Sequence, residues 1–321
     1  MNRLATTALA VLMLAGTEPA LAQSVTITLA HQYPDTQPIG DGYNLWARRV
    51  EELSGGDIAV KVFPGSTLIG SDESFAAVAD GSVQASNMIG GFQTGDIPEL
   101  AVIALPFLFD DYGHYRRTVD AGLFDMVAGL YEAKGIKLLN LFPKGWNQVF
   151  HKSEFLLEPD DFQGAQLRGV GGTASLALTM LGANEVRLPT TEVTAGLQRG
   201  IVDGLITNCV AHIGRSWYEQ TPYVSFVSFA NDGEGLGMNL DVWNSLTPEQ
   251  QAIVQQAAKE MDDFEWEMQQ RVESTECFDD WKRLGVHVQI ATPEQRAALR
   301  EKVMPLYTQY EAELPITLEV E

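Results

Sequence analysis

The sequence predicts an α/β protein with two domains, and three observations support this prediction. Strand-like and helix-like segments alternate from residue 25 onward, which is typical of βαβ units around a parallel sheet. A stretch of about 300 residues is long enough for two domains of roughly 100 to 200 residues each. Finally, the segment Pro143–Gln148 (PKGWNQ) places Pro and Gly between two apolar segments, which predicts a hinge.

The first 22 residues have the features of a secretory signal peptide. A short positive start, Met1–Arg3, precedes an apolar run, Leu4–Ala15, and an A-x-A cleavage signal at Ala20–Ala22. We therefore expect the mature chain to begin at Gln23 and to reside in the periplasm. No later window approaches the roughly 18 consecutive apolar residues of a membrane span.

Composition narrows the range of partners. A formal net charge of −22 argues against nucleic acid and against an anionic membrane surface. It does not exclude an anionic ligand, because salt screens surface carboxylates more than roughly 10 Å away. The five histidines are scattered and lack metal-ligand spacing, so we expect no metal site and no cofactor.

The sequence has two cysteines, Cys209 and Cys277. An oxidising periplasm permits a disulfide, but a chain of this length does not need one for stability. We therefore expect two buried free thiols, and the pairing stays open at this stage.

The alternation of elements can be followed along the chain. In the first half we expect strands at 25–29, 57–63, 84–89 and 136–142, and helices at 41–53, at 70–79 with Ser71 as N-cap, and at 115–133. Residues 102–109 contain a proline among large apolar side chains and are expected to form a packed loop. His31 follows the first strand and Phe92 follows the strand at 84–89, where ligand contacts are common in α/β sheets.

The second half repeats the pattern. We expect strands at 166–168, 224–230 and 286–290, helices at 174–181 and 210–218, and a return crossing at 233–239. Thr247 and Gln250 form a capping box with a proline between them, and neither Pro nor Gly recurs until Gly285. This predicts a helix of roughly 35 residues, about 50 Å long, that braces both domains or breaks near Glu273–Cys277. A second capping box, at Thr292–Gln295, predicts a terminal helix to about Tyr310.

Arg168 is the centre of the most informative stretch, Asp160–Asn208. It follows a short predicted strand and precedes a turn containing Gly171 and Gly172, so its guanidinium is expected over the crevice at the carboxyl ends of the strands. Backbone N–H groups at the following helix start also favour an anion, and a carboxylate suits this arrangement best. The residues from Gly169 also fit a dinucleotide fingerprint, G-x-G-x-x-A, but an exported protein rarely meets NAD. The plain alternative is a tight strand-to-helix turn without a ligand.

Several longer motifs resemble one family. They are VEELSGGDIAVKVFPGSTLIGSDE at 50–73, LPFLF at 105–109, DFQGAQLR at 161–168, LGA at 181–183 and PTTEVTAGLQRGIVDG at 189–204. Together they resemble the solute receptors of TRAP (tripartite ATP-independent periplasmic) transporters, the C4-dicarboxylate-binding proteins, over nearly all of the mature chain.

The resemblance implies two α/β domains that close like a clamshell, with a long helix spanning both. Residues 23–145 and 234–273 would form domain I, and residues 146–233 and 274–321 domain II. Arg168 falls on the family's arginine that pairs with a ligand carboxylate, and closure would signal a membrane permease driven by an ion gradient. We expect a monomer. The expected ligand-binding residues share a place at strand ends, turns or the hinge: Arg168, Asn208, Thr207, Trp146, Asn147, Gln148, Thr190, Gly171, Gly172, Phe92, His31 and Glu73.

Other positions depart from the family's pattern. Many sugar-acid-binding relatives carry a second arginine just after the hinge, where this chain has Trp146, Asn147 and Gln148, which argues against a second anionic group on the ligand. Val170 and two glycines stand where Pro and Asn are frequent, and Thr190 stands where a bulky aromatic is common. The pocket is therefore expected to take something bulkier than a small dicarboxylate, with an aromatic side chain such as Trp146 stacking on it.

The sequence also bears on two other functional classes, a hydrolase and a sensor-linked binding protein. A periplasmic hydrolase would need a nucleophile with a base, but the sequence has no G-x-S-x-G motif, and the paired acids Asp160 and Asp161 are adjacent in a turn rather than opposed across a cleft. A binding protein of the same fold that serves a sensor kinase instead of a permease would have the same sequence features. The ligand itself stays open between a C4-dicarboxylate and a bulkier, aromatic or hydroxylated acid.

Overall fold

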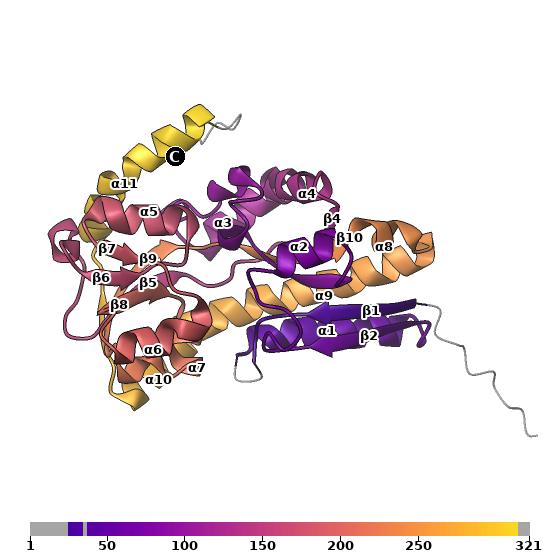
Figure 1. The fold of residues 1–321 in the computed structure, drawn as a ribbon, viewed down its shortest axis with the longest axis horizontal. Coiled ribbons are helices and arrows are strands. Elements are labelled where there is room, and N and C mark those ends of the chain that lie inside the picture. Colours follow the sequence, from indigo (N-terminus) through magenta and orange to yellow (C-terminus); the bar gives the residue numbers. More distant parts are fainter. Residues whose placement is uncertain (1–24, 35–36, 314–321) are drawn as a thin grey trace, which may run out of the picture.

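The computed structural model describes residues 25–34 and 37–313, with only the backbone described for residues 311–313. These residues form two β-sheets. The sheets belong to two α/β lobes that lie side by side, and one long helix runs from the first lobe into the second (Figure 1). The two-lobed α/β fold expected from the sequence is thus confirmed. The expected signal peptide lies outside the described residues.

The first sheet has the strand order β2-β1-β3-β10-β4. Its strands are β1 Val25–Ala30, β2 Ile58–Phe63, β3 Ala85–Ile89, β4 Ile136–Leu138 and β10 Glu234–Asn239. The strand β1 pairs in parallel with β2 and β3, whereas β10 runs antiparallel to β3 and β4. The helices that contact this sheet are α1 Ile39–Leu53, α2 Ser74–Ala79, α4 Phe124–Glu132 and α8 Leu240–Ser245, and α3 Tyr112–Thr118 precedes α4 along the chain. The βαβ opening predicted for the N-terminal region is therefore present.

The second sheet has the strand order β11-β9-β5-β8-β6-β7. Its strands are β5 Asn147–His151, β6 Gln166–Arg168, β7 Asn184–Val186, β8 Gly204–Thr207, β9 Tyr223–Ala230 and β11 His287–Ile290. The helices of this lobe are α5 Gly172–Leu181, α6 Val193–Gln198, α7 Cys209–Gly214, α10 Cys277–Leu284 and α11 Pro293–Glu313. The chain enters this sheet at β5, directly after the predicted hinge, and returns to the first sheet between β9 and β10.

The helix α9, Pro248–Arg271, connects the lobes. It begins with the predicted capping box, in which Thr247 and Gln250 bond each other's backbone N–H groups. A π-helical turn at Val272–Glu276 joins it to α10, so the predicted break near this point is a widened turn in a continuous helical rod. Gly285, with φ 74°, ends the rod, because a left-handed residue there favours glycine.

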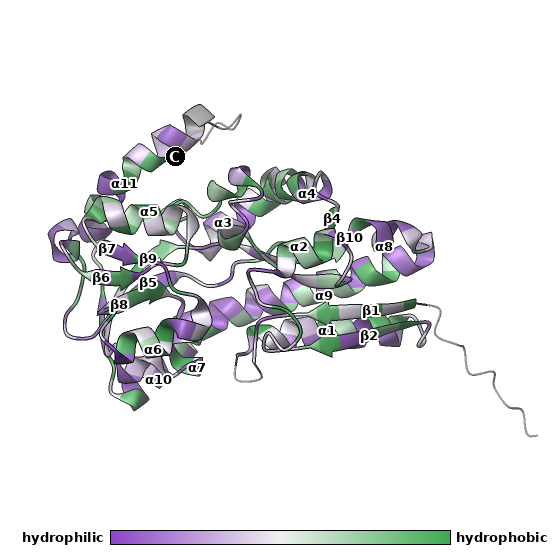
Figure 2. Cartoon of the chain, in the orientation of Figure 1, coloured by the Kyte–Doolittle hydropathy of each residue, from purple (hydrophilic) through white to green (hydrophobic). Residues whose placement is uncertain are grey.

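One apolar core extends along this rod into both lobes. On α9 the buried side chains recur at helical spacing (Val254, Ala257, Ala258, Met261 and Met268), and they belong to the same cluster as Trp46 of α1 and Trp217 and Trp281 of the second lobe. Figure 2 shows hydrophobic residues on the strands of both sheets and a largely hydrophilic α9 between them. A second core, under α5 and α11, includes Val102, Leu105 and Phe107 of the predicted packed loop.

Three details differ from the sequence expectations. The helix expected at 115–133 is interrupted by a π-helical segment, Val119–Leu123, in which Gly122 has a φ of 121°. The strand expected at 136–142 ends at Leu138, because the Asn140 side chain accepts the Leu236 N–H in place of a backbone carbonyl. Ser71 does not cap a helix, since α2 begins three residues later at Ser74.

The expectation of free thiols is wrong. Cys209 and Cys277 form a disulfide across a sequence separation of 68, with Cα atoms 6.1 Å apart. Cys209 begins α7 and Cys277 begins α10, and these two helices pack against each other in the second lobe. Chain length alone could not reveal that the two helices are neighbours.

Removal of this disulfide is expected to destabilise the protein. We expect the double variant C209S/C277S to lose about 4 kcal/mol of unfolding free energy, because the unfolded chain regains the entropy of a closed loop of this length. Urea unfolding with and without a reductant measures the effect. Reductant should destabilise the wild type and leave the variant unchanged; equal stabilities of the two proteins without reductant would contradict the prediction.

Candidate functional site

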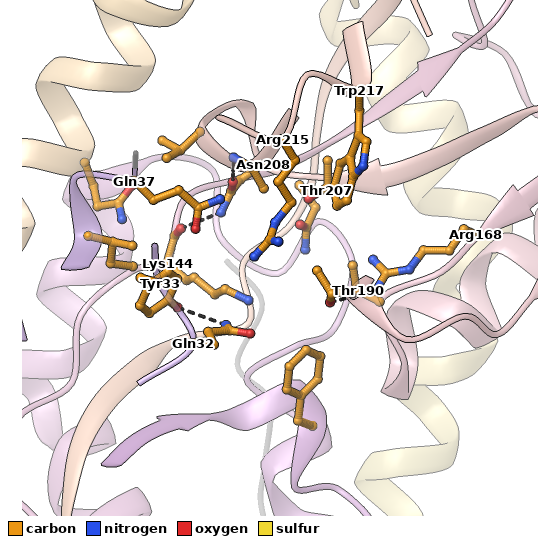
Figure 3. A pocket seen from close by; sticks show the side chains of 17 residues that line it. Gln32, Tyr33, Gln37, Lys144, Arg168, Thr190, Thr207, Asn208, Arg215 and Trp217 are labelled. Carbon is orange, nitrogen blue, oxygen red and sulfur yellow. Dashed lines mark hydrogen bonds between the residues drawn. The ribbon is translucent and has the colours of Figure 1, made fainter. Parts of the chain in front are cut away.

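A cavity lies between the two lobes (Figure 3). Its walls come from the first lobe, the hinge, the second lobe and α9: Gln32, Tyr33, Gln37, Ile39, Phe92, Lys144, Asn147, Arg168, Val170, Thr190, Thr207, Asn208, Val210, Ala211, Arg215, Trp217 and Gln269. The volume of this cavity is about 50 Å³, and a neighbouring cavity of about 340 Å³ shares Phe92, Arg168, Val170 and Thr190 with it. A ligand that outgrows the first cavity would extend past these four residues into the second.

Arg168 ends β6 and points into this cavity, as the sequence predicts. Its side chain is only 5% exposed. The Nε donates to the Leu188 carbonyl at 3.2 Å, and one terminal nitrogen donates to the Thr190 hydroxyl at 3.3 Å. No carboxylate of the described residues lies within 4 Å of the guanidinium. Since a guanidinium has five N–H donors, most of them remain available to a ligand.

Burial lowers the pKa of Arg168 to about 10, an effect that the nearby Arg215 reinforces and the Asp232 carboxylate opposes. Arg168 therefore keeps its charge at neutral pH although it is largely out of water. A buried charge without a partner of opposite charge is energetically unfavourable. An anion that entered the cavity would relieve this cost.

The other predicted polar residues of the cavity have more than one task. Asn208 caps α7 by accepting the Ala211 N–H at 2.8 Å, and its Nδ2 donates to the Lys144 carbonyl at 2.9 Å. Its side chain therefore ties the hinge to the second lobe as well as lining the cavity. Thr207 ends β8 and Asn147 begins β5, so both lie at strand ends beside Arg168.

Four residues expected to touch the ligand line neither of the two cavities. The Trp146 ring packs with Phe109 and Tyr115 in a small core instead of forming a pocket wall. Gln148 accepts the N–H groups of Val227 and Ser228, both at 2.8 Å. The Trp146 ring is thus held by residues of the first lobe and Gln148 by β9 of the second, and sequence position could show neither contact.

The remaining two also lie elsewhere. His31 is buried, with its ring stacked on that of Tyr43 at 5.1 Å. Glu73 accepts the Gly70 N–H at 2.9 Å in an exposed turn. The glycines Gly171 and Gly172 line only the second cavity; both have positive φ values, and both lie near the backbone carbonyl of Gly91 in the opposite lobe.

The sequence analysis missed two cations of the cavity, Lys144 and Arg215. Trp217, which belongs to the shared apolar core, also lines the cavity. A signal for Arg215 was present, because Asn208, Ala211 and Arg215 have the i, i+3, i+7 spacing of one helix face. Lys144 was visible only as a hinge residue.

Buried acids form the floor beneath the cavity. Glu234 accepts hydrogen bonds from the hydroxyls of Tyr33 and Tyr43, and burial raises its pKa to about 7 although the nearby Lys144 charge opposes the shift. Burial also raises the pKa of Asp232. Glu273, in the π-helical turn, accepts the Trp146 N–H at 2.7 Å and the Tyr112 hydroxyl at 2.5 Å, and its burial raises its pKa to about 8.

The described residues contain no group of three or more His, Cys, Asp or Glu side chains that could hold a metal ion. Within the same residues, every helix is too short or too polar to cross a membrane.

Two lobes, a shared helix and a polar cleft define a solute-binding protein of the clamshell type. The family model of the bacterial extracellular solute-binding proteins, family 7, matches residues 29–313, and the chain belongs to this family. One relative is the C4-dicarboxylate-binding periplasmic protein DctP of Rhodobacter capsulatus, 25% identical over 92% of this chain and 89% of its own length. Another is the uncharacterized protein YiiZ of Salmonella typhimurium, 29% identical over 80% of this chain and 79% of its own length.

Solved structures of TRAP periplasmic solute-binding proteins have the same fold. That of Ochrobactrum anthropi superposes with a TM-score of 0.82 at 26% identity and covers 91% of each chain. That of Desulfovibrio desulfuricans, with bound sn-glycerol-3-phosphate, has a TM-score of 0.84 at 25% identity and covers 90% of this chain and 93% of its own. The similarity to the TRAP solute receptors expected from the sequence motifs is confirmed.

Glu273 predicts a pH dependence of stability. Its pKa is raised in the folded protein, so the unfolded chain releases this proton at a lower pH than the folded one. Stability is therefore fully present below the unfolded pKa, near 4.5, and falls as pH rises towards about 8. We expect Glu273→Gln, which keeps an acceptor for the Trp146 N–H, to lose less unfolding free energy than the wild type between pH 5 and 8.

Urea unfolding at several pH values measures this difference. The exposed Glu267→Gln on the same helix serves as the control and should follow the wild type. Parallel curves for wild type and Glu273→Gln would show that Glu273 is ionised in the folded protein.

Proposed function

We propose that this chain is a periplasmic receptor that binds an organic carboxylate through Arg168 and delivers it to a TRAP-type membrane permease. The observation that carries the proposal is the buried guanidinium of Arg168, which faces a cavity between the lobes with no carboxylate of the described residues as partner. A binding role requires no nucleophile or metal, so we propose that the ligand leaves the cleft unchanged.

A carboxylate fits the free donors of Arg168 better than other groups do. Its two oxygens match the planar fork of a guanidinium, and charge-assisted hydrogen bonds are about twice as strong as neutral ones. The bonds to Leu188 and Thr190 hold the fork in place before the ligand arrives, so less freedom is lost on binding. Lysine could not provide this two-point contact.

The cavity lining indicates a polar ligand with one apolar face. Asn147, Thr190 and Thr207 offer amide and hydroxyl groups beside Arg168, which suits hydroxyl or carbonyl groups on the ligand. Phe92 lines both cavities from the opposite lobe and offers an apolar surface. These residues support a hydroxylated or keto acid as readily as a simple dicarboxylate.

The ligands of similar proteins support the same class. Solved relatives of this fold hold succinate, D-glucuronate, β-D-galacturonate and sn-glycerol-3-phosphate, each of which carries at least one anionic group. The TRAP family of these relatives supports a permease as the recipient of the ligand.

We also propose that the lobes move as units. Domain I would comprise residues 23–145 and 234–273, and domain II residues 146–233 and 274–321, because the strands of each sheet fall within these bounds. The cavity takes residues from both, so a bound ligand contacts both lobes and favours the closed arrangement. A permease could then distinguish the loaded from the empty receptor by the relative arrangement of the two lobes.

Substitution of Arg168 tests the proposal. A thermal-shift screen of the mature protein against several hundred organic acids should identify a stabilising acid, since a ligand at 100 times its dissociation constant adds about 2.7 kcal/mol. Calorimetric titration of that acid into Arg168→Ala is expected to show affinity reduced by at least about 30-fold, because one partner of a buried charge pair is lost.

The exposed Arg199, at the end of α6, provides a matched control. Arg199→Ala should bind the acid as the wild type does. If Arg168→Ala folds and keeps the wild-type affinity, the carboxylate is bound elsewhere and the proposal fails.

A further inference from the structure

The cavity is unusually positive for so acidic a chain. Among the described residues that line it, three are cations, Lys144, Arg168 and Arg215, and none is Asp or Glu. The whole chain has a formal net charge of −22, so three cations without an acid in one small cavity are not explained by composition. The arrangement therefore needs a local reason.

Arg215 is the least compensated of the three. It follows α7, and in Figure 3 its guanidinium points towards the middle of the cavity. Its Nε is buried and has no hydrogen-bond partner among the described residues, and no carboxylate of those residues lies within 4 Å of its nitrogens. Its ring contact with Trp217, at 5.8 Å, supports the side chain without neutralising the charge.

Lys144 approaches from the hinge. In Figure 3 its ammonium also points to the middle of the cavity, on the side of Gln32 and Tyr33. It lies 5.2 Å from the centre of the Phe92 ring, and no carboxylate of the described part of the chain is within 4 Å of it. Arg168 and its hydroxyl partner Thr190 occupy the other end of the same view.

Acids beneath the cavity balance only part of this charge. The carboxylates of Asp232 and Glu234 act on Lys144, and that of Asp232 also acts on Arg168. No carboxylate contributes to the environment of Arg215, whose own charge repels that of Arg168. A negative group between Arg215 and Lys144 would offset the repulsion between Arg215 and Arg168, which is costly in a poorly solvated site.

We propose that Arg215, facing Lys144, forms a second anion subsite, so that the ligand is a dianion whose two negative groups rest on Arg168 and on Arg215. This inference rests on the proposed carboxylate receptor and narrows its ligand class. It also reverses the expectation from the hinge sequence, where the absence of a second arginine argued against a second anionic group. The charge missing at Trp146–Gln148 is supplied instead from the end of α7 and from the hinge lysine.

Matched pairs of acids test the second subsite. Calorimetric titration compares succinate with succinamate, glutarate with glutaramate, and galactarate with galactonate; each pair differs by one negative charge at similar size. For at least one pair, the wild type should bind the dianion at least tenfold more tightly than the monoanion. Arg215→Gln should abolish this preference while leaving the affinity for the monoanion within about threefold.

Three more variants separate the possible outcomes. Arg215→Lys keeps the charge and should retain part of the preference, and Arg199→Gln should behave as the wild type. Arg168→Ala should weaken both members of a pair; if it does not, the carboxylate proposal fails while the role of Arg215 is judged by its own variant.

Any of three results overturns the inference. They are a wild type that prefers no dianion of the panel, an Arg215→Gln variant that binds both members of a pair equally less tightly, and an Arg215→Gln variant that keeps the full preference. Equal weakening would mean that Arg215 only supports the cavity wall, and thermal melting of the free variants would show whether that wall has been lost.

Discussion

A positive charge buried between the two lobes is the central energetic problem of this structure. Arg168 is 5% exposed and has only a carbonyl and a hydroxyl as partners. A desolvated charge is costly unless partners in good geometry compensate it. The Leu188 carbonyl and the Thr190 hydroxyl are such partners, and the Asp232 carboxylate also acts on Arg168.

The connections between the lobes bear directly on this site. Glu273, in the π-helical turn of the rod, accepts the Trp146 N–H just after the hinge. The disulfide of Cys277 then ties the rod to α7, which carries Asn208 at its start and Arg215 at its end. The same elements that join the lobes thus also orient the cavity side chains.

Sequence reasoning located Arg168 because its signal is local. A strand followed by a glycine-containing turn places an arginine at a sheet edge whatever the rest of the chain does. The same reasoning expected Trp146 and Gln148 at the ligand, but the Trp146 ring packs against Phe109 and Tyr115, and Gln148 bonds to β9. Arg215 and Lys144 were missed because they are 71 positions apart in the sequence. The packing of the two lobes, and no motif, brings them into the same cavity.

The two-lobed α/β class, the helix rod with its capping box and the arginine at the end of β6 are all readable from the sequence. They follow from alternating apolar periodicity and from backbone preferences within a few residues. Only the folded structure shows the Cys209–Cys277 pairing, the buried acids near the cavity and the three cations that line it. Each of these depends on side chains that burial brings together across long sequence separations, and burial is a property of the folded whole.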